Sequence, residues 1–383
     1  MNRFLKSRLR SVFVRSAFGA AIWRSVSRLS PASRPTTSTE TLALDSAELV
    51  ELAWPAATSK PLVGVVKDAD ATTVPNAYWP KYVRFLQYNE VPYDFYDVHA
   101  ADWFDKASRF DIVLWRSPSD PASQWEAKTK IHMIESQLHI SCLPSENELW
   151  YYEDKERQSY LLEHAHVSHI ATFVSHGLAD SLAFVRGAQY PLVSKIVTGS
   201  GSLGVSRIVS VQEAEQLCRR VFSEPGAHTY WPYLNQKDYV FFQEYIAGAE
   251  SDLRVVLAGD DAWGYYRHPA AGDFRASGSK IVEKKAVPEE ALDLAAHVWG
   301  ALGCRSQLAV DMLWDPRDGC YRVIEFGTFF QIDTPEQLKV DGVAGRYHRT
   351  ENGWEFLPGK YWVQDFGARN VLMVYLKQRS DTA

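Results

Sequence analysis

Short apolar runs alternate with longer amphipathic stretches in the first part of this chain. LVGVVKD from Leu62, YDFYDV from Tyr93 and FDIVLWRSP from Phe110 are typical of strands, and PNAYWPKYVRFLQYNEV between the first two is typical of a helix. Strands that alternate with helices predict a parallel sheet covered by helices. We therefore expect a small parallel α/β domain over residues 59–147.

The pattern changes after residue 147. We expect SENELWYYEDKERQSYLLEHAHV to form one helix that enters a new domain. The strands predicted after it are HIATFVSH, PLVSKIV, VSRIVS, DYVFFQEYI, DLRVVLAGD and AWGYYRHPA, and the helices are VQEAEQLCRRVF and PEEALDLAAHVWGALG. An acid-bearing hairpin, QLAVDMLWDPRDGCYRVIEF, follows.

Composition narrows the class of protein. A chain of 383 residues that is 46% hydrophobic has room for two or three packed domains. Its net charge of -6 gives no general attraction to nucleic acid, so we expect no nucleic-acid partner. The four cysteines show no C-x-x-C spacing, which argues against a zinc site or a disulfide framework and favours a reducing compartment. The sequence contains no run of 18 apolar residues, so we expect no transmembrane helix.

The first 39 residues are basic and carry no acid before Glu40. Three interpretations stay open: a mitochondrial-type presequence, a helix in weak contact with an anionic membrane surface, or a plain tail. We favour the tail or the membrane contact, which implies a cytoplasmic protein, with the mitochondrial matrix as the alternative. Residues 1–58 are expected to be a basic N-terminal segment and a linker.

Lys195 opens a glycine-rich stretch, SKIVTGSGSLGVSRIV. Its glycines satisfy G-x-G-x-x-G: Gly199, Gly201 and Gly204. A strand pattern follows them instead of a helix, which excludes a dinucleotide fold, and no Gly-Lys-Ser/Thr follows, which excludes a P-loop. We expect a hairpin flap whose N–H groups, with Ser200 and Ser202, close over phosphates that Lys195 reaches. The alternative is a glycine-rich turn beside a solvated lysine.

Two acids face one another across the later hairpin. Asp311 and Glu325 are equally far from Asp318 in its turn, so they should lie opposite or nearly opposite each other among apolar neighbours. Buried carboxylates are costly unless a metal cation or a Lys or Arg side chain neutralises them, and Mg²⁺ is held by one or two carboxylates together with substrate phosphates. The sequence therefore predicts ATP and Mg²⁺, with Mn²⁺ as a substitute. The alternative is a surface acid pair or a salt bridge to Arg322.

Taken in order, these segments resemble the ATP-grasp superfamily, and among its members the α-L-glutamate ligase (RimK-like) type of carboxylate–amine ligase. The resemblance covers residues 148–345 and rests on ordered motifs: Lys155 in YYEDKERQSYLL, Lys195 before GSGSLGV, FFQEYI, the D-x-R of Asp252 and Arg254, FRAS around Arg275, and the acids Asp311 and Glu325. It implies an ATP-grasp fold, mixed α/β and α+β. An N-terminal Rossmann-like pre-ATP-grasp domain (59–147) and a C-terminal extension (346–383) would flank it.

The resemblance also implies roles for individual residues. Lys155 and Lys195 would contact the phosphates and the adenine side of ATP, under a flap formed by Gly199 to Gly204. The linker Gln243, Glu244, Tyr245 and Ile246 would be the hinge, with Glu244 reading the adenine amino group. Asp252 would touch the ribose or the polar network of the site. Arg254 and Arg275 would balance the γ-phosphate and the acyl phosphate, and Asp311 and Glu325 would hold the metal.

The implied activity is ATP-dependent joining of a carboxylate to an amine through an acyl phosphate, on small-molecule or polymer-borne substrates. Two positions depart from the family. Gly327 stands where the family carries an asparagine metal ligand, and FRAS lacks the usual glycine pair. A non-catalytic ATP-binding or regulatory module and a phosphotransferase are therefore the alternatives. A homo-oligomer is compatible with the sequence.

One arginine of the first domain is a further candidate. Arg116 ends a predicted strand, at the sheet edge where α/β proteins bind ligands. It would either hold a substrate carboxylate or cap a local acid.

Overall fold

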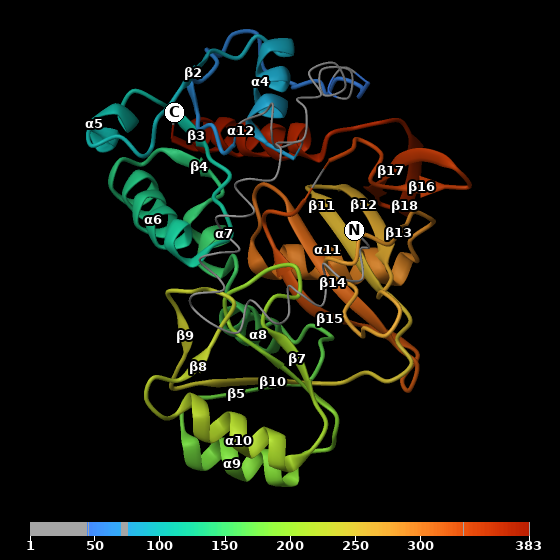
Figure 1. The fold of residues 1–383 in the computed structure, drawn as a ribbon. Helices are drawn as coiled ribbons and strands as arrows, with labels where there is room; N and C mark the ends of the chain where they lie inside the picture. The colour runs from blue at the N-terminus through green and yellow to red at the C-terminus, as the bar shows by residue number, and fades with distance from the viewer. Residues whose placement is uncertain (1–43, 45, 70–75, 332, 383) are drawn as a thin grey trace, which may run out of the picture. The chain divides into compact units, whose positions relative to one another are not determined.

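The computed structural model describes residues 44, 46–69, 76–331 and 333–382, and the strands within them form four sheets (Figure 1). The basic segment 1–39 lies outside the described residues, so its interpretations stay predictions. Among the described helices, none combines the length and the apolar character needed to cross a bilayer.

The first sheet is parallel throughout, with strand order β2-β1-β3-β4. Its strands are β1 (Val63–Val65), β2 (Tyr93–Phe95), β3 (Ile112–Leu114) and β4 (Ser141–Leu143). The connections carry α4 (Trp79–Tyr88), α5 (Trp103–Ala107), α6 (Pro121–His132) and the π-helical η1 (Met133–Gln137). The central strands β1 and β3 are fully buried, which explains their unbroken apolar runs. The predicted parallel pairing is confirmed, while the Rossmann-like character of this region stays a prediction.

The single helix predicted from residue 145 to 167 is wrong. The structure has two helices, α7 (Glu146–Tyr151) and α8 (Lys155–His164). Asp154 starts the second helix by accepting a hydrogen bond from the Arg157 amide at 3.1 Å, as an N-cap residue does. Glu153, just before it, has a left-handed backbone with a φ of 54°. The break interrupts an otherwise helical pattern and brings Glu153 and Lys155 to the cavities described below.

The second sheet is antiparallel, in the order β5-β10-β6-β7. Its strands are β5 (Thr172–Ser175), β6 (Leu192–Lys195), β7 (Val205–Ile208) and β10 (Val240–Glu244). Helix α9 (Leu178–Gly187) connects β5 to β6, helix α10 (Val211–Val221) follows β7, and both lie on one face of the sheet (Figure 1). These two helices and the sheet enclose a small core that includes Val185, Cys218 and Phe242. A two-stranded hairpin joins β8 (Ala227–His228) to β9 (Asn235–Gln236).

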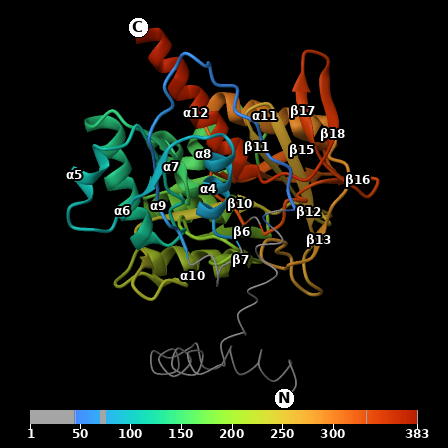
Figure 2. The same cartoon turned by 90° about the horizontal axis from the view of Figure 1, so that it is seen from above.

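The third sheet holds eight strands, and six of them follow the order β15-β14-β11-β12-β17-β16. They are β11 (Asp252–Ala258), β12 (Asp261–Arg267), β14 (Leu308–Asp315), β15 (Cys320–Gly327), β16 (Lys339–Val340) and β17 (Val343–Thr350), with β13 (Val282–Glu283) on β12 and β18 (Gly353–Pro358) on β17. Helix α11 (Glu289–Leu302) packs against β11, β14 and β15. The β17–β18 hairpin projects from the sheet in Figure 2.

The C-terminal helix α12 (Val363–Thr382) returns to the first sheet, where it packs on α4, β3 and β4 (Figure 1). An ion pair of 2.8 Å joins Arg84 of α4 to the buried Asp365 of α12. The predicted boundary after residue 345 falls inside β17. At the other end, Ala47 and Val50 are buried in the main core, so part of the segment predicted as linker is packed.

Candidate functional site

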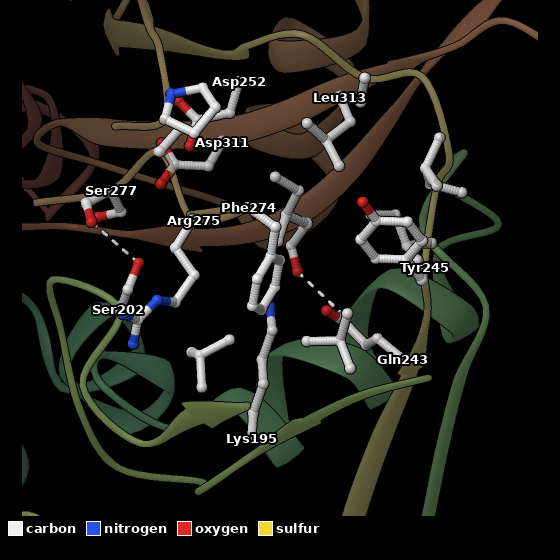
Figure 3. Close-up of a pocket in the computed structure, with 18 of the residues that line it drawn as sticks. Lys195, Ser202, Gln243, Tyr245, Asp252, Phe274, Arg275, Ser277, Asp311 and Leu313 are labelled. Atoms are coloured by element: carbon white, nitrogen blue, oxygen red, sulfur yellow. Dashed lines mark hydrogen bonds between the residues drawn. The ribbon is translucent and has the colours of Figure 1, made fainter. Parts of the chain in front are cut away.

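Two adjoining cavities collect most of the predicted site residues. The first, of about 450 Å³, is lined by β6, by residues 243–252 at the end of β10 and after it, by the segment 267–277 and by the acidic hairpin (Figure 3). The second, of about 680 Å³, also reaches Arg116 and residues 327–337. Both are lined by Lys155, Gly199, Arg267, Asp311 and Glu325. A ligand that filled the first cavity would therefore end on the same charged groups that border the second.

Asp311 and Glu325 lie directly opposite each other on β14 and β15, as predicted. Their pairing depends on a β-bulge. The register shifts between Asp311 and Met312, which pairs with Val323, so Ile324 is the extra residue. Without the shift, Asp311 would face Ile324 instead of Glu325. The bulge thus brings two carboxylates together on one face of the sheet.

Two arginines, not Arg322, neutralise Asp311. Arg254 donates to both of its oxygens, from Nε at 2.6 Å and Nη2 at 2.7 Å, and Arg267 Nη2 donates at 2.7 Å. Burial alone would raise the pKa of Asp311, but the two guanidinium groups outweigh it and the pKa is lowered. The predicted alternative of a salt bridge to Arg322 is wrong, because Arg322 pairs with Asp315 and Asp318.

Arg267 is the residue that the sequence analysis missed. It pairs with Asp252 through bonds of 2.6 and 2.8 Å and thereby links that acid to Asp311. Asp252 thus lies in the polar network of the site, where burial raises its pKa against the opposing effect of Arg267. The signal was present in the sequence. Asp252 and Arg267 are equally far from the turn between Gly259 and Asp260, and they face each other across β11 and β12.

The two predicted lysines are both buried beside Glu325. Lys155 Nζ donates to the Gly199 carbonyl at 2.5 Å and lies 3.5 Å from Glu325 Oε2. Burial would lower the pKa of Lys155, but Glu325 and Glu153 raise it. At Lys195 the balance between burial and neighbouring charge is reversed. Its burial lowers the pKa to about 8, although Glu325 opposes the change. In Figure 3 Lys195 extends from β6 into the first cavity.

The glycine stretch is the tip of a hairpin, as predicted. β6 and β7 pair antiparallel, with Lys195 opposite Val205. Gly204 has a φ of 75°, and a Cβ added there would lie 2.5 Å from the Ile196 side chain. The hydroxyls expected to meet phosphates bond other protein groups in this structure. Ser202 Oγ donates to the Ser277 carbonyl at 3.0 Å, and Ser200 Oγ lies 3.3 Å from Ser119 Oγ.

The predicted hinge lines the first cavity, but its side chains differ in their surroundings. Gln243 is buried, and its Nε2 donates to Thr172 Oγ1 at 3.0 Å and to the Ile324 carbonyl at 3.3 Å. Tyr245 and Ile246 contribute apolar surface. The Glu244 carboxylate pairs with Arg317. An adenine amino group would therefore compete with Arg317 for that carboxylate.

An aromatic wall of the first cavity was not foreseen. The rings of Tyr245 and Phe274 lie edge to face with centroids 6.1 Å apart (Figure 3). Arg207 of β7 lies 5.9 Å from the first ring and 5.8 Å from the second. Flat apolar surface with a cation beside it suits a nucleobase. Arg275, next along the chain, pairs with Asp273 at 2.8 Å and stays apart from the Arg254 network.

Comparisons with known proteins address the fold. No protein-family model matches this sequence, and no curated protein matches it. Among solved structures, D-cycloserine synthetase DcsG is similar with a TM-score of 0.56 and 16% identity, over 82% of this chain and 99% of that protein. D-alanine–D-alanine ligase from Bacillus anthracis, complexed with ATP, gives 0.51 and 16%, over 83% and 99%. This chain has the ATP-grasp fold. The predicted fold class is confirmed.

The resemblance implied an asparagine metal ligand at position 327, where this chain has a glycine. Gly327 lies on the second cavity, and an added Cβ would meet the Tyr152 ring at 3.6 Å, an ordinary contact. The described residues contain no group of three or more His, Cys, Asp or Glu side chains able to hold a metal ion. Asp311 and Glu325 offer oxygen ligands to a divalent cation, which would have to displace the bonds of Arg254 and Arg267 on Asp311 and take its other ligands from a bound triphosphate.

Proposed function

We propose that this ATP-grasp protein is an ATP-dependent ligase that joins a carboxylate to an amine through an acyl phosphate. The observation that carries the proposal is the meeting of two cavities at one charged cluster. The first cavity, with its aromatic wall and glycine hairpin, suits a nucleotide. The second leaves room for two small substrates beside the terminal phosphate.

The chemistry of the cluster fits this reaction. A carboxylate oxygen attacks the γ-phosphorus and ADP leaves, after which the amine attacks the acyl carbon and phosphate leaves. The first step brings two anions together, so it requires cations more than covalent help from the protein. Lys155, Lys195 and Arg254 would supply fixed positive charge. A Mg²⁺ ion held by Asp311, Glu325 and the nucleotide would neutralise the phosphates.

The similar structures support the proposal at the level of reaction class, since one is a synthetase and the other a ligase that binds ATP. The sequence motifs favour the α-L-glutamate ligase (RimK-like) type, with small-molecule or polymer-borne substrates. A cytoplasmic location belongs to the same proposal. It suits the free thiols of Cys142, Cys218 and Cys304, which are all buried.

A second candidate is an ATP-binding module without ligase turnover. Gly327 supports it, because one side-chain metal ligand of the family is absent. The two arginines on Asp311 support it as well, because a cation must compete with them. A phosphotransferase would share the first step and lack the amine-dependent one.

A substrate screen that follows ADP and phosphate separates these candidates. The full chain is given ATP, Mg²⁺ and pairs of carboxylates and amines. The ligase releases ADP only when both substrates of a productive pair are present. The phosphotransferase needs no amine, and the binding module binds nucleotide without releasing ADP on any pair.

The same screen needs a test of the nucleotide site. Lys195→Ala should weaken ATP binding by on the order of tenfold or more, because it removes a buried charge beside the phosphates. The matched control is Lys237→Ala, whose exposed side chain pairs only with Glu224 among the described residues. ATP binding that is absent, or unchanged by Lys195→Ala, would overturn the proposal.

A further inference from the structure

Arg116 lies at the topological switch point of the parallel sheet. The strand order is β2-β1-β3-β4. From β1 the chain moves to β2 on one side, and from β2 it crosses to β3 on the other side of β1. The order therefore reverses between the adjacent strands β1 and β3. Asp68 follows β1 and Arg116 follows β3, both at the carboxyl edge. Open α/β sheets bind ligands in the crevice at this point.

Within the described residues, Asp68 holds the Arg116 guanidinium in place but satisfies only one of its N–H donors. Nη1 donates to Asp68 Oδ2 at 3.2 Å, and the group lies 5.0 Å from the centre of the Tyr78 ring. Asp68 also accepts the main-chain N–H groups of Tyr78 and Trp79 at 3.1 Å, so its charge is shared with the start of α4. Asp68 therefore neutralises the positive charge of Arg116 only in part.

The remaining donors of Arg116 need an acceptor. A guanidinium has five N–H groups, and the bond to Asp68 is the one that it makes within the described part of the chain. Its Nε is buried there without a partner, and the whole side chain is 19% exposed. A buried unsatisfied donor is costly, and a planar guanidinium binds a carboxylate through two parallel bonds.

The second cavity leads from the charged cluster to Arg116. Tyr152, Phe329 and Phe330 line it, and the Phe329 ring packs edge-on against Tyr152 and Tyr78 with centroids 5.3 and 5.6 Å away. These rings give the cavity an apolar wall, with Arg116 beside Tyr78. The cavity thus suits a ligand with an apolar stretch and an anionic end.

Glu153 offers the opposite charge on the same cavity. It lies two residues before Lys155, in the break between α7 and α8, with the left-handed φ of 54° noted above. Its carboxylate makes no hydrogen bond or ion pair with any described residue. Burial raises its pKa to about 7, against the opposing effects of Lys155 and Arg254. A strained backbone that presents an unpaired acid to a cavity is typical of a binding site.

We propose that the amine substrate also carries a carboxylate, as amino acids and short peptides do, and that this carboxylate binds Arg116 while its ammonium group lies at Glu153. The proposal rests on the ligase function proposed above and names the class of its second substrate. It makes Arg116 a residue that determines specificity.

Binding of matched acids and amides tests this directly. The full chain, saturated with the non-hydrolysable analogue AMP-PNP and Mg²⁺, is titrated calorimetrically with glycine, β-alanine, 4-aminobutyrate and alanyl-alanine, and with the carboxamide of each. We expect at least one acid to bind about tenfold or more tightly than its amide, which keeps the ammonium group and lacks the charge. Arg116→Gln should reduce the acid to the level of the amide and leave the amide unchanged.

Two further variants keep the test interpretable. Arg116→Lys retains the charge that Asp68 needs and should keep part of the preference for the acid, because it loses only the paired geometry. Glu153→Gln should weaken acid and amide alike by several-fold. Thermal unfolding and the affinity for AMP-PNP show whether each variant is folded.

The proposal is overturned if no member of the panel binds, if acids and amides bind equally, or if Arg116→Gln weakens both to the same extent. The outcomes separate it from the ligase proposal. Acid selectivity that depends on Arg116, without ADP release on any substrate pair, contradicts the ligase alone. ADP release with a selectivity that ignores Arg116 contradicts this inference alone.

Discussion

At the scale of single residues, Lys195 shows most clearly how burial prepares the site for an anion. Its pKa is lowered to about 8 because the side chain is buried, so near pH 8 about half of the ligand-free protein carries a neutral Lys195. A triphosphate beside the amine favours the charged form. Nucleotide binding at pH 8 should therefore take up on the order of half a proton.

Calorimetry in two buffers of different ionisation enthalpy measures this uptake. It should disappear at pH 6.5, where Lys195 is already protonated, and in Lys195→Met at either pH. An uptake at pH 8 that survives in Lys195→Met would assign the proton to another group.

Glu153 makes stability depend on pH in a predictable direction. Burial raises its pKa from an ordinary 4.5 to about 7. Between these values the folded protein holds a proton that the unfolded chain releases, so the stability present at low pH is lost as the pH rises toward 7. Glu153→Gln removes this loss. It should raise the free energy of unfolding at pH 8 by on the order of 2 kcal/mol and change it little at pH 4.5.

Denaturant unfolding at the two pH values provides the measurement. Glu163→Gln, an exposed position on α8, gives the background of the same substitution. Equal effects of Glu153→Gln at both pH values would show that its carboxylate is not perturbed.

Gly327 tests the account of the metal site. A Cβ fits there, because its nearest neighbours would be the Tyr152 ring and the Phe329 carbonyl, at 3.6 to 3.9 Å. Gly327→Asn would add an oxygen ligand near Glu325. We expect it to lower the Mg²⁺ concentration required for ATP binding by on the order of tenfold. Gly327→Ala, which adds only the Cβ, should leave that concentration unchanged, and an equal effect of both variants would point to packing instead.

At the scale of elements, nucleotide binding should depend most on the conformation of the β6–β7 hairpin. Gly201 and Gly204 both have left-handed backbones, with φ of 60° and 75°. A Cβ at Gly201 meets nothing within 4 Å, whereas one at Gly204 meets Ile196 at 2.5 Å. Alanine costs roughly 1–2 kcal/mol at either position, and only Gly204→Ala adds the clash.

The two alanine variants therefore form a matched pair. Gly204→Ala should weaken AMP-PNP binding by at least tenfold more than Gly201→Ala, measured by calorimetry on folded protein. Equal losses would mean that only backbone freedom matters at the flap, and no loss in either would remove the flap from the nucleotide site.

Elements with local signals were the ones that the sequence predicted well. The hairpin flap followed from strand patterns on both sides of the glycines. The facing acids were predicted from their equal distance from Asp318, but in the structure it is the bulge at Ile324 that produces their pairing. The break between α7 and α8 was missed because the helical pattern continues through it. The N-cap residue Asp154 marks where α8 begins. The bulge at Ile324 leaves no local signal, since an extra residue in a strand changes neither composition nor alternation enough to be recognised.

At the scale of the whole molecule, the order of motifs predicted the ATP-grasp fold before any tertiary contact was known. What it could not supply were partners distant in sequence. Helix α12 returns to the first sheet, and Arg267 reaches Asp311 on another strand pair. The second cavity joins Arg116 to residues more than two hundred positions later. Such contacts depend on how the sheets pack, so the functional site was predicted as residues and not as geometry.

The most direct test of the central claim follows an oxygen atom. Carboxylates from the productive pairs of the substrate screen are labelled with ¹⁸O and incubated with the protein, ATP, Mg²⁺ and the amine. Formation of an acyl phosphate transfers one carboxylate oxygen to phosphorus, so the account predicts ¹⁸O in the released inorganic phosphate, in step with the amide formed. Amide formation with unlabelled phosphate, or release of AMP in place of ADP, would contradict it.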